Sequence, residues 1–294
     1  MSYDLYFGRG KPLTETEFFS YFLGRRNYTR QNRQAWYSND HTGVYFNFLI
    51  SDPNDLQDAE KPRLASFNIN LYRPHFFGLE AGPELDAFIE HFELTVIDPQ
   101  EKERERFSVE RFLSNWNQAN EFGYKASLNL GRSPAEVHVR PSTELEAIWR
   151  WNYEVPRIQT ELGQNVFVPR IVWINADGDL NSAAVWPDGI ATLVPAVEKI
   201  IVPRNKMAPR NLLSRQKDMC FIDQSLLDQC LAPLEAGRYP LPCRTPAYLS
   251  PPKNVDRFVR ALTPERRKME GVSMDKVLDA EIVEGAKRQG ESLP

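Results

Sequence analysis

Apolar and polar residues alternate or recur at regular spacings along most of the chain, and these spacings predict both strands and helices. Alternation from Leu64 to Tyr72 is typical of a strand with one buried face. In residues 83–91 the apolar positions recur three and four apart, as on a helix, and Pro83 suits a first helical turn. The aromatic residues of 1–7 predict a further strand.

Capping and turn residues place the ends of other elements. Thr14 is followed three residues later by Glu17, the pattern of a capping box, which predicts a helix from Thr14 to about Arg25. A polar segment ending in Gly43 separates two strand-like runs, so a hairpin with a glycine at positive φ is expected there. Further predictions are strands at 34–37, 44–50 and 94–97, a helix from Ser108 that ends before Gly123, and a short helix capped by Thr143.

The second half is rich in strand-like runs. Residues 166–174, 183–186 and 191–202 predict a β meander, with Asp177-Gly178-Asp179 as one turn. Helices are predicted near 226–234 and 255–262. The charge-dense end of the chain carries an apolar stripe at helical spacing, formed by Met274, Val277, Leu278, Ile282 and Ala286. We expect this helix to dock on its own protein, with a partner as the alternative.

Together these elements predict an α+β fold of two mixed halves, each a small, mainly antiparallel sheet flanked by helices, with a C-terminal charged helix. Residues 131–141 contain one glycine and two prolines beside polar residues, which indicates the break between the halves. We expect an N-terminal α+β domain at 1–141, a β-meander plus helices domain at 142–263, and a charged helical tail at 264–294.

Composition limits the possible partners. A formal net charge of −4 over 294 residues gives no general attraction to nucleic acid or anionic lipid, so nucleic acid is a disfavoured partner. The apolar runs are all far shorter than a membrane span of about 20 residues, so no membrane partner is expected. Three cysteines, Cys220, Cys230 and Cys243, fit a reducing compartment, which predicts a cytoplasmic location.

Motifs of common catalytic sites are absent from the sequence, including the phosphate-binding loop, the nucleophile elbow and the paired zinc-ligand patterns. We therefore predict no catalytic residue, no metal ligand set and no cofactor. Asp40-His41 beside Tyr37 and Tyr45 is the nearest pattern to an acid–base cluster, but a structural turn explains it better. A basic and aromatic patch, whose charge neighbouring residues do not offset, is formed by Arg25, Arg26, Tyr28, Arg30, Arg33 and Trp36.

Three stretches carry a resemblance to known proteins: residues 36–46 (Trp-Tyr-Ser-Asn-Asp-His-Thr-Gly-Val-Tyr-Phe), 75–81 (His-Phe-Phe-Gly-Leu-Glu-Ala) and 94–99 (Leu-Thr-Val-Ile-Asp-Pro). They resemble uncharacterised bacterial cytoplasmic proteins. In style the chain is similar to toxin immunity proteins, including those of type VI secretion. This resemblance implies a protein that inhibits a cognate toxin by stoichiometric occlusion, and it transfers no individual residue.

Three functional hypotheses follow. The first is a protein-binding module, with an acidic loop that faces a basic toxin through Asp52, Asp55, Asp58 and Glu60. The second is a hydrolase-type enzyme with a site assembled from distant residues in an interdomain cleft. The third is a scaffold or secretion-system component that docks through its C-terminal helix, so that deletion from Gly271 onward leaves the fold intact. A small-molecule ligand is left open.

Overall fold

In the computed structural model, residues 1–52, 64–101, 106–129, 138–211, 214–215, 217–234 and 237–290 are described. Contacts between residues divide the chain into two compact units. The first contains residues 1–145 and 275–294, and the second contains residues 146–274. In the sequence, the second unit is therefore an insertion within the first. Both combine helices with mainly antiparallel sheets, which confirms the predicted α+β class.

A six-stranded sheet in the order β2-β3-β4-β5-β1-β6 forms the centre of the first unit. Its strands are β1 (Ser2–Gly8), β2 (Tyr28–Gln31), β3 (Gln34–Asn39), β4 (Val44–Ile50), β5 (Ala65–Asn70) and β6 (Thr95–Ile97). Each neighbouring pair is antiparallel. The structure confirms every predicted strand of this sheet, and Gly43 has the expected positive φ of 74°. The edge strand β2 was not predicted.

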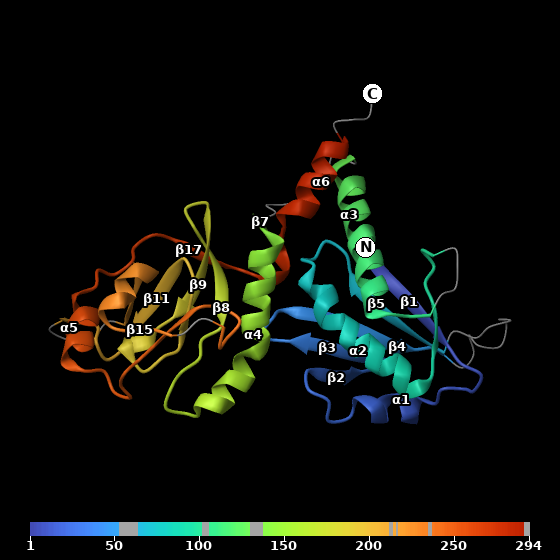
Figure 1. Ribbon diagram of the computed structural model, residues 1–294, viewed down its shortest axis with the longest axis horizontal. Coiled ribbons are helices and arrows are strands. Elements are labelled where there is room, and N and C mark those ends of the chain that lie inside the picture. The colour runs from blue at the N-terminus through green and yellow to red at the C-terminus, as the bar shows by residue number, and fades with distance from the viewer. Residues whose placement is uncertain are drawn as a thin grey trace. The chain divides into compact units, whose positions relative to one another are not determined.

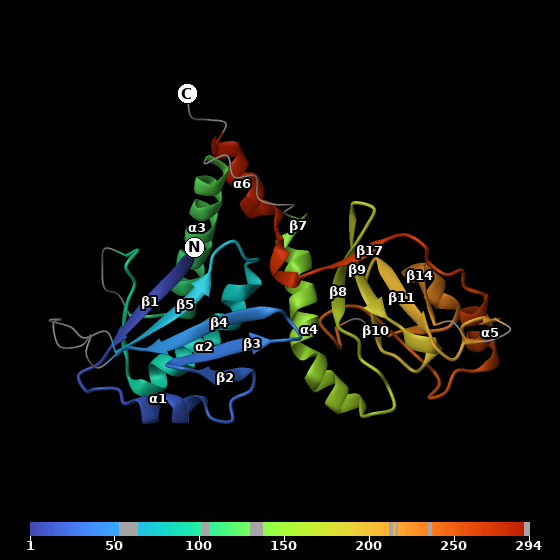
Figure 2. The same ribbon diagram turned by 180° about the vertical axis from the view of Figure 1, so that it is seen from behind.

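Helices α1 (Glu15–Phe22), α2 (Phe76–Phe92) and α3 (Val109–Asn129) belong to the same unit. Figure 1 shows α2 in front of the sheet, and Figure 2 shows the strands in front when the unit is seen from behind. Aromatic rings fill the core between helix and sheet. The ring centroid of Phe88 on α2 lies 4.6 Å from that of Phe48 and 5.5 Å from that of Phe7.

Helix ends differ from the predictions in three places. The capping box of Thr14 and Glu17 is present, but α1 ends at Phe22, before the predicted Arg25, because Leu23 is extended and Gly24 has a φ of +76°. Helix α2 begins at Phe76, so that Pro83 lies inside it rather than in its first turn. Helix α3 continues through Gly123, because a single glycine costs a packed helix only about 1 kcal/mol.

The end of the chain returns to the first unit. Strand β18 (Val277–Asp279) pairs in parallel with β7 (His138–Arg140), and α6 (Ala280–Gly290) contacts α3. Leu278 and Val283 form an apolar cluster with Tyr124, so the expected docking on its own protein is confirmed. The predicted charged helix over 264–294 is not confirmed, since β17 (Met269–Val272), the 3-10 turn η4 (Met274–Lys276) and β18 precede the short α6.

The second unit contains a five-stranded sheet in the order β14-β11-β9-β8-β17. Besides β17 its strands are β8 (Ile171–Ala176), β9 (Asp179–Val185), β11 (Lys199–Arg204) and β14 (Asp218–Asp223). The predicted meander is interrupted, because β9 and β11 are parallel and need a crossover between them. The predicted strand 191–202 is accordingly divided: β10 (Val194–Pro195) belongs to a separate sheet with β15 (Ala232–Pro233) and β16 (Cys243–Thr245).

The remaining elements are α4 (Ser142–Leu162), η2 (Pro187–Gly189), β12 (Arg210–Asn211), β13 (Ser214–Arg215), η3 (Gln224–Gln229) and α5 (Lys253–Ala261). Helix α4 is longer than predicted and begins at Ser142, one residue before the expected cap. Its Asn152 side chain exchanges two hydrogen bonds with the backbone of Ile171, at 2.8 and 2.9 Å, and so fixes the start of β8. The predicted helix 226–234 is only the 3-10 turn η3, whereas α5 matches its prediction.

Candidate functional site

A groove of about 540 Å³ lies in the first unit between α1 and the edge strand β2. Figures 1 and 2 both show α1 beside β2 at the margin of this unit. Phe19 and Leu23 give the helical wall an apolar surface, and Leu23 is 84% exposed. Tyr28, Thr29 and Arg30 of β2 form the opposite wall. The groove is therefore bounded by a helix on one side and an extended strand on the other.

The outer edge of β2 carries backbone groups that lack partners among the described residues. β2 and β3 are antiparallel, with Arg30 opposite Ala35. Ser38 N donates to Asn27 O at 2.9 Å, which sets the alternation of bonded and non-bonded pairs along the two strands. It follows that Tyr28 and Arg30 direct their N–H and C=O groups away from β3. These are the groups with which another strand pairs.

Arginine side chains dominate the charge around the groove. The Arg30 guanidinium lies 3.9 Å from the centroid of the Phe19 ring and pairs with Glu15 at 3.2 Å. Arg33 lies 3.8 Å from the same Glu15 carboxylate. Arg26 is exposed and forms no ion pair within the part of the chain that the structure describes. Two arginines thus face one carboxylate, which leaves an excess of positive charge beside the groove.

The basic and aromatic patch expected from the sequence does not form one surface. Tyr28 lies opposite Tyr37, so it projects from the other face of the sheet than Trp36. Arg25 pairs with Glu84 at 3.2 Å, contrary to the expectation that neighbouring charges leave the patch unbalanced. Tyr28 Oη also donates to Glu84, at 2.9 Å. Burial, and then the charge of Glu84, hold the pKa of Tyr28 well above its usual value, so this hydroxyl stays a neutral donor.

Only one of the four acidic residues predicted to bind a partner is among the described residues. Asp55, Asp58 and Glu60 lie outside the described residues, and Asp52 is described. Asp52 lies two residues after β4 and is half-buried. The Arg33 guanidinium donates to the carbonyl of the adjacent Ser51. Binding of a basic partner through this loop stays a prediction.

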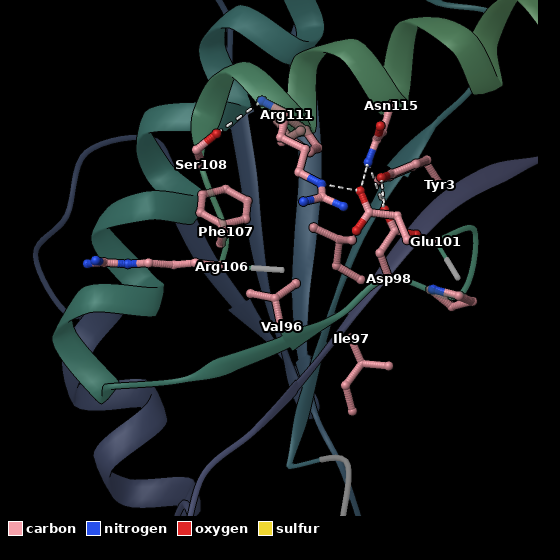
Figure 3. A pocket seen from close by; sticks show the side chains of 13 residues that line it. Tyr3, Val96, Ile97, Asp98, Glu101, Arg106, Phe107, Ser108, Arg111 and Asn115 are labelled. Atoms are coloured by element: carbon pink, nitrogen blue, oxygen red, sulfur yellow. Dashed lines mark hydrogen bonds and ion pairs between the residues drawn. The ribbon is translucent and has the colours of Figure 1, made fainter. Parts of the chain in front are cut away.

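A second pocket, of about 300 Å³, lies in the first unit and is lined by β1, β6 and the start of α3. Figure 3 shows Tyr3, Asp98, Glu101, Arg111 and Asn115 converging on one side of it. Tyr3 Oη donates to Asp98, whereas Arg111 and Asn115 donate to Glu101. Burial first, and the bond to Asp98 next, raise the pKa of Tyr3 far above its usual value. Because these residues are separated in sequence, no motif indicates this pocket.

The other sequence candidates serve the fold. Tyr37 and Tyr45 lie on opposite faces of the sheet, since Ser38 is opposite Tyr45, so the two hydroxyls do not converge on one site as the sequence pattern suggested. Asp177 and Gly178, both at positive φ, form the turn between β8 and β9, as predicted. Within the described ranges, no three His, Cys, Asp or Glu side chains gather in a group that could hold a metal ion. The cysteines are unpaired, and Cys220 and Cys243 are buried, as expected for small apolar residues.

Comparison with protein-family models, curated proteins and solved structures finds no match for this chain. The function therefore has to be argued from its own geometry. Among the described residues, no helix is both long and apolar enough to cross a membrane. Sequence reasoning missed the groove because it interpreted residues 25–36 as a basic patch. Asn32, which turns the chain between β2 and β3 with a positive φ of 54°, was the missed signal for strand β2, although not for the groove itself.

Proposed function

We propose that this protein is a protein-binding module that takes an extended segment of its partner along β2. The observation that carries the proposal is the outward-facing backbone of Tyr28 and Arg30 at the side of an open groove. An extended peptide that adds to a free sheet edge gains main-chain hydrogen bonds for affinity, while side-chain pockets supply specificity. The groove beside α1 offers such a pocket.

The lining of the groove favours an extended segment that presents acidic and apolar side chains to α1. Successive side chains of a strand point to opposite sides, so every second one faces the side of the sheet on which Phe19, Leu23 and the Arg30 guanidinium lie. On this side, Arg30 and Arg33 outnumber the single Glu15. Acidic side chains match this charge, and electrostatic complementarity of this kind speeds association and rejects basic partners.

From the resemblance of residues 36–46, 75–81 and 94–99 to toxin immunity proteins, we infer a cytoplasmic role in which the partner is a bacterial toxin. Under this proposal, the toxin presents the acidic extended segment, and strand addition at β2 contributes to its occlusion. The acidic loop around Asp52 provides a second surface for a basic region of the same toxin.

A proline substitution tests strand addition. Arg30→Pro removes one outward N–H but no hydrogen bond to β3, so the sheet is retained. We expect it to weaken binding of a fluorescent Val-Glu-Val-Glu-Val-Glu peptide roughly fivefold, because one hydrogen bond contributes about 1 kcal/mol. Fluorescence anisotropy measures this affinity.

Arg30→Gln is the matched control, because it removes the same charge and keeps the N–H group. The proline variant should therefore bind the peptide more weakly than the glutamine variant, while circular dichroism shows both folded. A Val-Lys repeat of the same length should bind more weakly than the Val-Glu peptide. Equal affinities of the two Arg30 variants for the peptide would argue against strand addition. Tighter binding of the Val-Lys peptide would argue against an acidic partner segment.

A further inference from the structure

The pocket lined by β1, β6 and α3 combines apolar walls with one polar side (Figure 3). Val96, Phe107 and Phe112 supply apolar surface, while Asp98 and Glu101 carry the negative charge. Its volume of about 300 Å³ is at the lower limit of small-molecule sites, which span about 300–1,000 Å³. The dimensions suit a compact molecule rather than a polymer.

The two carboxylates differ in how their charge is balanced. Glu101 accepts Arg111 Nε at 2.5 Å and also accepts the amide of Asn115. Asp98, by contrast, forms no ion pair with any Lys, Arg or His that the structure describes. Figure 3 shows the guanidinium of Arg106, a second cation of the lining, on the opposite side of the view from Asp98. Among the described residues that line the pocket, Asp98 is therefore the carboxylate without a cationic partner.

Neutral donors already reach Asp98. They are the hydroxyl of Tyr3, the backbone N of Gln100 at 2.9 Å and, at 3.5 Å, the amide of Asn115. The raised pKa of Tyr3 keeps its proton in place. A carboxylate offers about four lone-pair positions, so Asp98 can accept a further donor from a ligand.

We propose that this pocket binds a small organic cation, with its ammonium or amidinium group on Asp98 and its apolar body against Val96, Phe107 and Phe112. A charged donor forms a stronger hydrogen bond to a carboxylate than a neutral one. An anion would be repelled by Asp98. A bare divalent metal ion is a poor match, because only two carboxylates converge and one of them already pairs with Arg111.

Isothermal titration calorimetry with benzamidine as the probe tests the proposal, and benzamide is the matched neutral ligand of the same shape. We expect benzamidine to bind at least about tenfold more tightly than benzamide, because only the amidinium forms a charged hydrogen bond. Asp98→Asn should lower the benzamidine affinity about tenfold or more, by the same reasoning. Asp86→Asn, on α2 and outside the pocket lining, should leave it unchanged.

Because Asp98→Asn also alters the acceptor of Tyr3, Val96→Trp serves as a second variant that fills the pocket and keeps the carboxylate. It should abolish benzamidine binding while circular dichroism shows a folded protein. Equal binding of benzamide and benzamidine, absence of benzamidine binding at millimolar concentration, or unchanged affinity in both variants would overturn the proposal. The test involves neither β2 nor its peptide, so its outcome is independent of the groove.

Discussion

Arg204 is the most fully enclosed charge described in the second unit, with 0% of its side chain exposed. Its guanidinium donates two hydrogen bonds to Asp218, at 2.6 and 2.7 Å. It also donates to the carbonyls of Val259, Arg260 and Leu262 at the end of α5. One side chain therefore joins β11, β14 and α5.

Replacing Arg204 with methionine should destabilise the protein by about 3–5 kcal/mol, because it leaves the largely buried Asp218 without its cation. Urea unfolding followed by tryptophan fluorescence measures the change. Arg260→Met is the control, since Arg260 pairs with Asp256 at the surface, and we expect no measurable effect. Equal sensitivity of the two variants to urea would mean that the hydrogen bonds of Arg204 do not contribute to the stability of the protein.

Cys243 links stability to alkaline pH. Burial raises the pKa of its thiol from 9.0 to about 12. In the unfolded chain the thiol ionises near its ordinary value, so its contribution to stability is complete below about pH 9 and is lost as pH rises toward 12.

We expect Cys243→Ala to reduce the pH dependence of the unfolding free energy in this window by up to about 1.4 kcal/mol per pH unit, the value for one proton. The comparison is the difference between wild type and variant at each pH, in which the titration of tyrosines cancels. Urea titrations across the window provide it. If the unfolding free energies of wild type and variant change with pH in the same way, the thiol has the same pKa in the folded and unfolded states.

At the scale of elements, two glycines on α2 allow α3 to approach closely. A Cβ atom at Gly82 would lie 2.7 Å from Val109 Cγ1, and one at Gly78 would lie 3.0 Å from both Leu113 and Trp116. These distances are shorter than van der Waals contact, so only glycine fits between the two helices. Close packing here also positions the start of α3, which lines the pocket that contains Asp98.

Gly82→Ala should therefore destabilise the protein by about 1–3 kcal/mol through overpacking, although alanine is the better helix former. Adding Val109→Ala should restore much of the loss, because it removes the methyl group that the new Cβ meets. Thermal unfolding of the single and double variants measures both effects. Gly10→Ala, with no atom within 4 Å of the added Cβ, is the neutral control.

Capping and turn residues in the sequence correctly predicted the element ends that depend only on neighbouring residues. The capping box of Thr14 and the glycine of the β3–β4 turn act within a few residues, and both were found from the sequence. The start of α2 was missed because Pro83 favours a first turn, whereas the packing of Phe76 and Phe77 in the core extends the helix backwards. The groove beside β2 and the pocket that contains Asp98 could not be predicted, since each depends on which strands become neighbours in the sheet.

At the scale of the whole molecule, the last residues of the chain complete its first unit. Asp279, only 2% exposed, accepts the backbone N of His75 at 2.8 Å and bonds its ring at 2.5 Å. Asp275 lies 3.4 Å from Arg73. The C-terminal segment is therefore a structural part of the unit that contains β2 and both candidate sites.

Truncation after Met274 should destabilise the first unit by several kcal/mol, because each buried Leu or Val contributes roughly 1.5–3 kcal/mol. It removes Leu278, Val283 and the acceptor of His75 together. This expectation differs from that of a scaffold whose C-terminal helix can be deleted without harm to the fold. Differential scanning calorimetry distinguishes the two, and an unchanged transition of the truncated chain would favour the scaffold.

Because the first unit consists of two segments separated in the sequence, its folding can be completed only late in synthesis. Residues 1–145 leave the ribosome before the whole inserted unit, and domains generally fold as units while the chain emerges. Until β18 and α6 are translated, β7 has no parallel neighbour and Tyr124 has no cover. Residues 146–274 are therefore finished first, although they begin later. A nascent chain that stops before β18 contains the complete second unit but an incomplete first unit. Only translation through α6 yields the unit that we propose binds a partner.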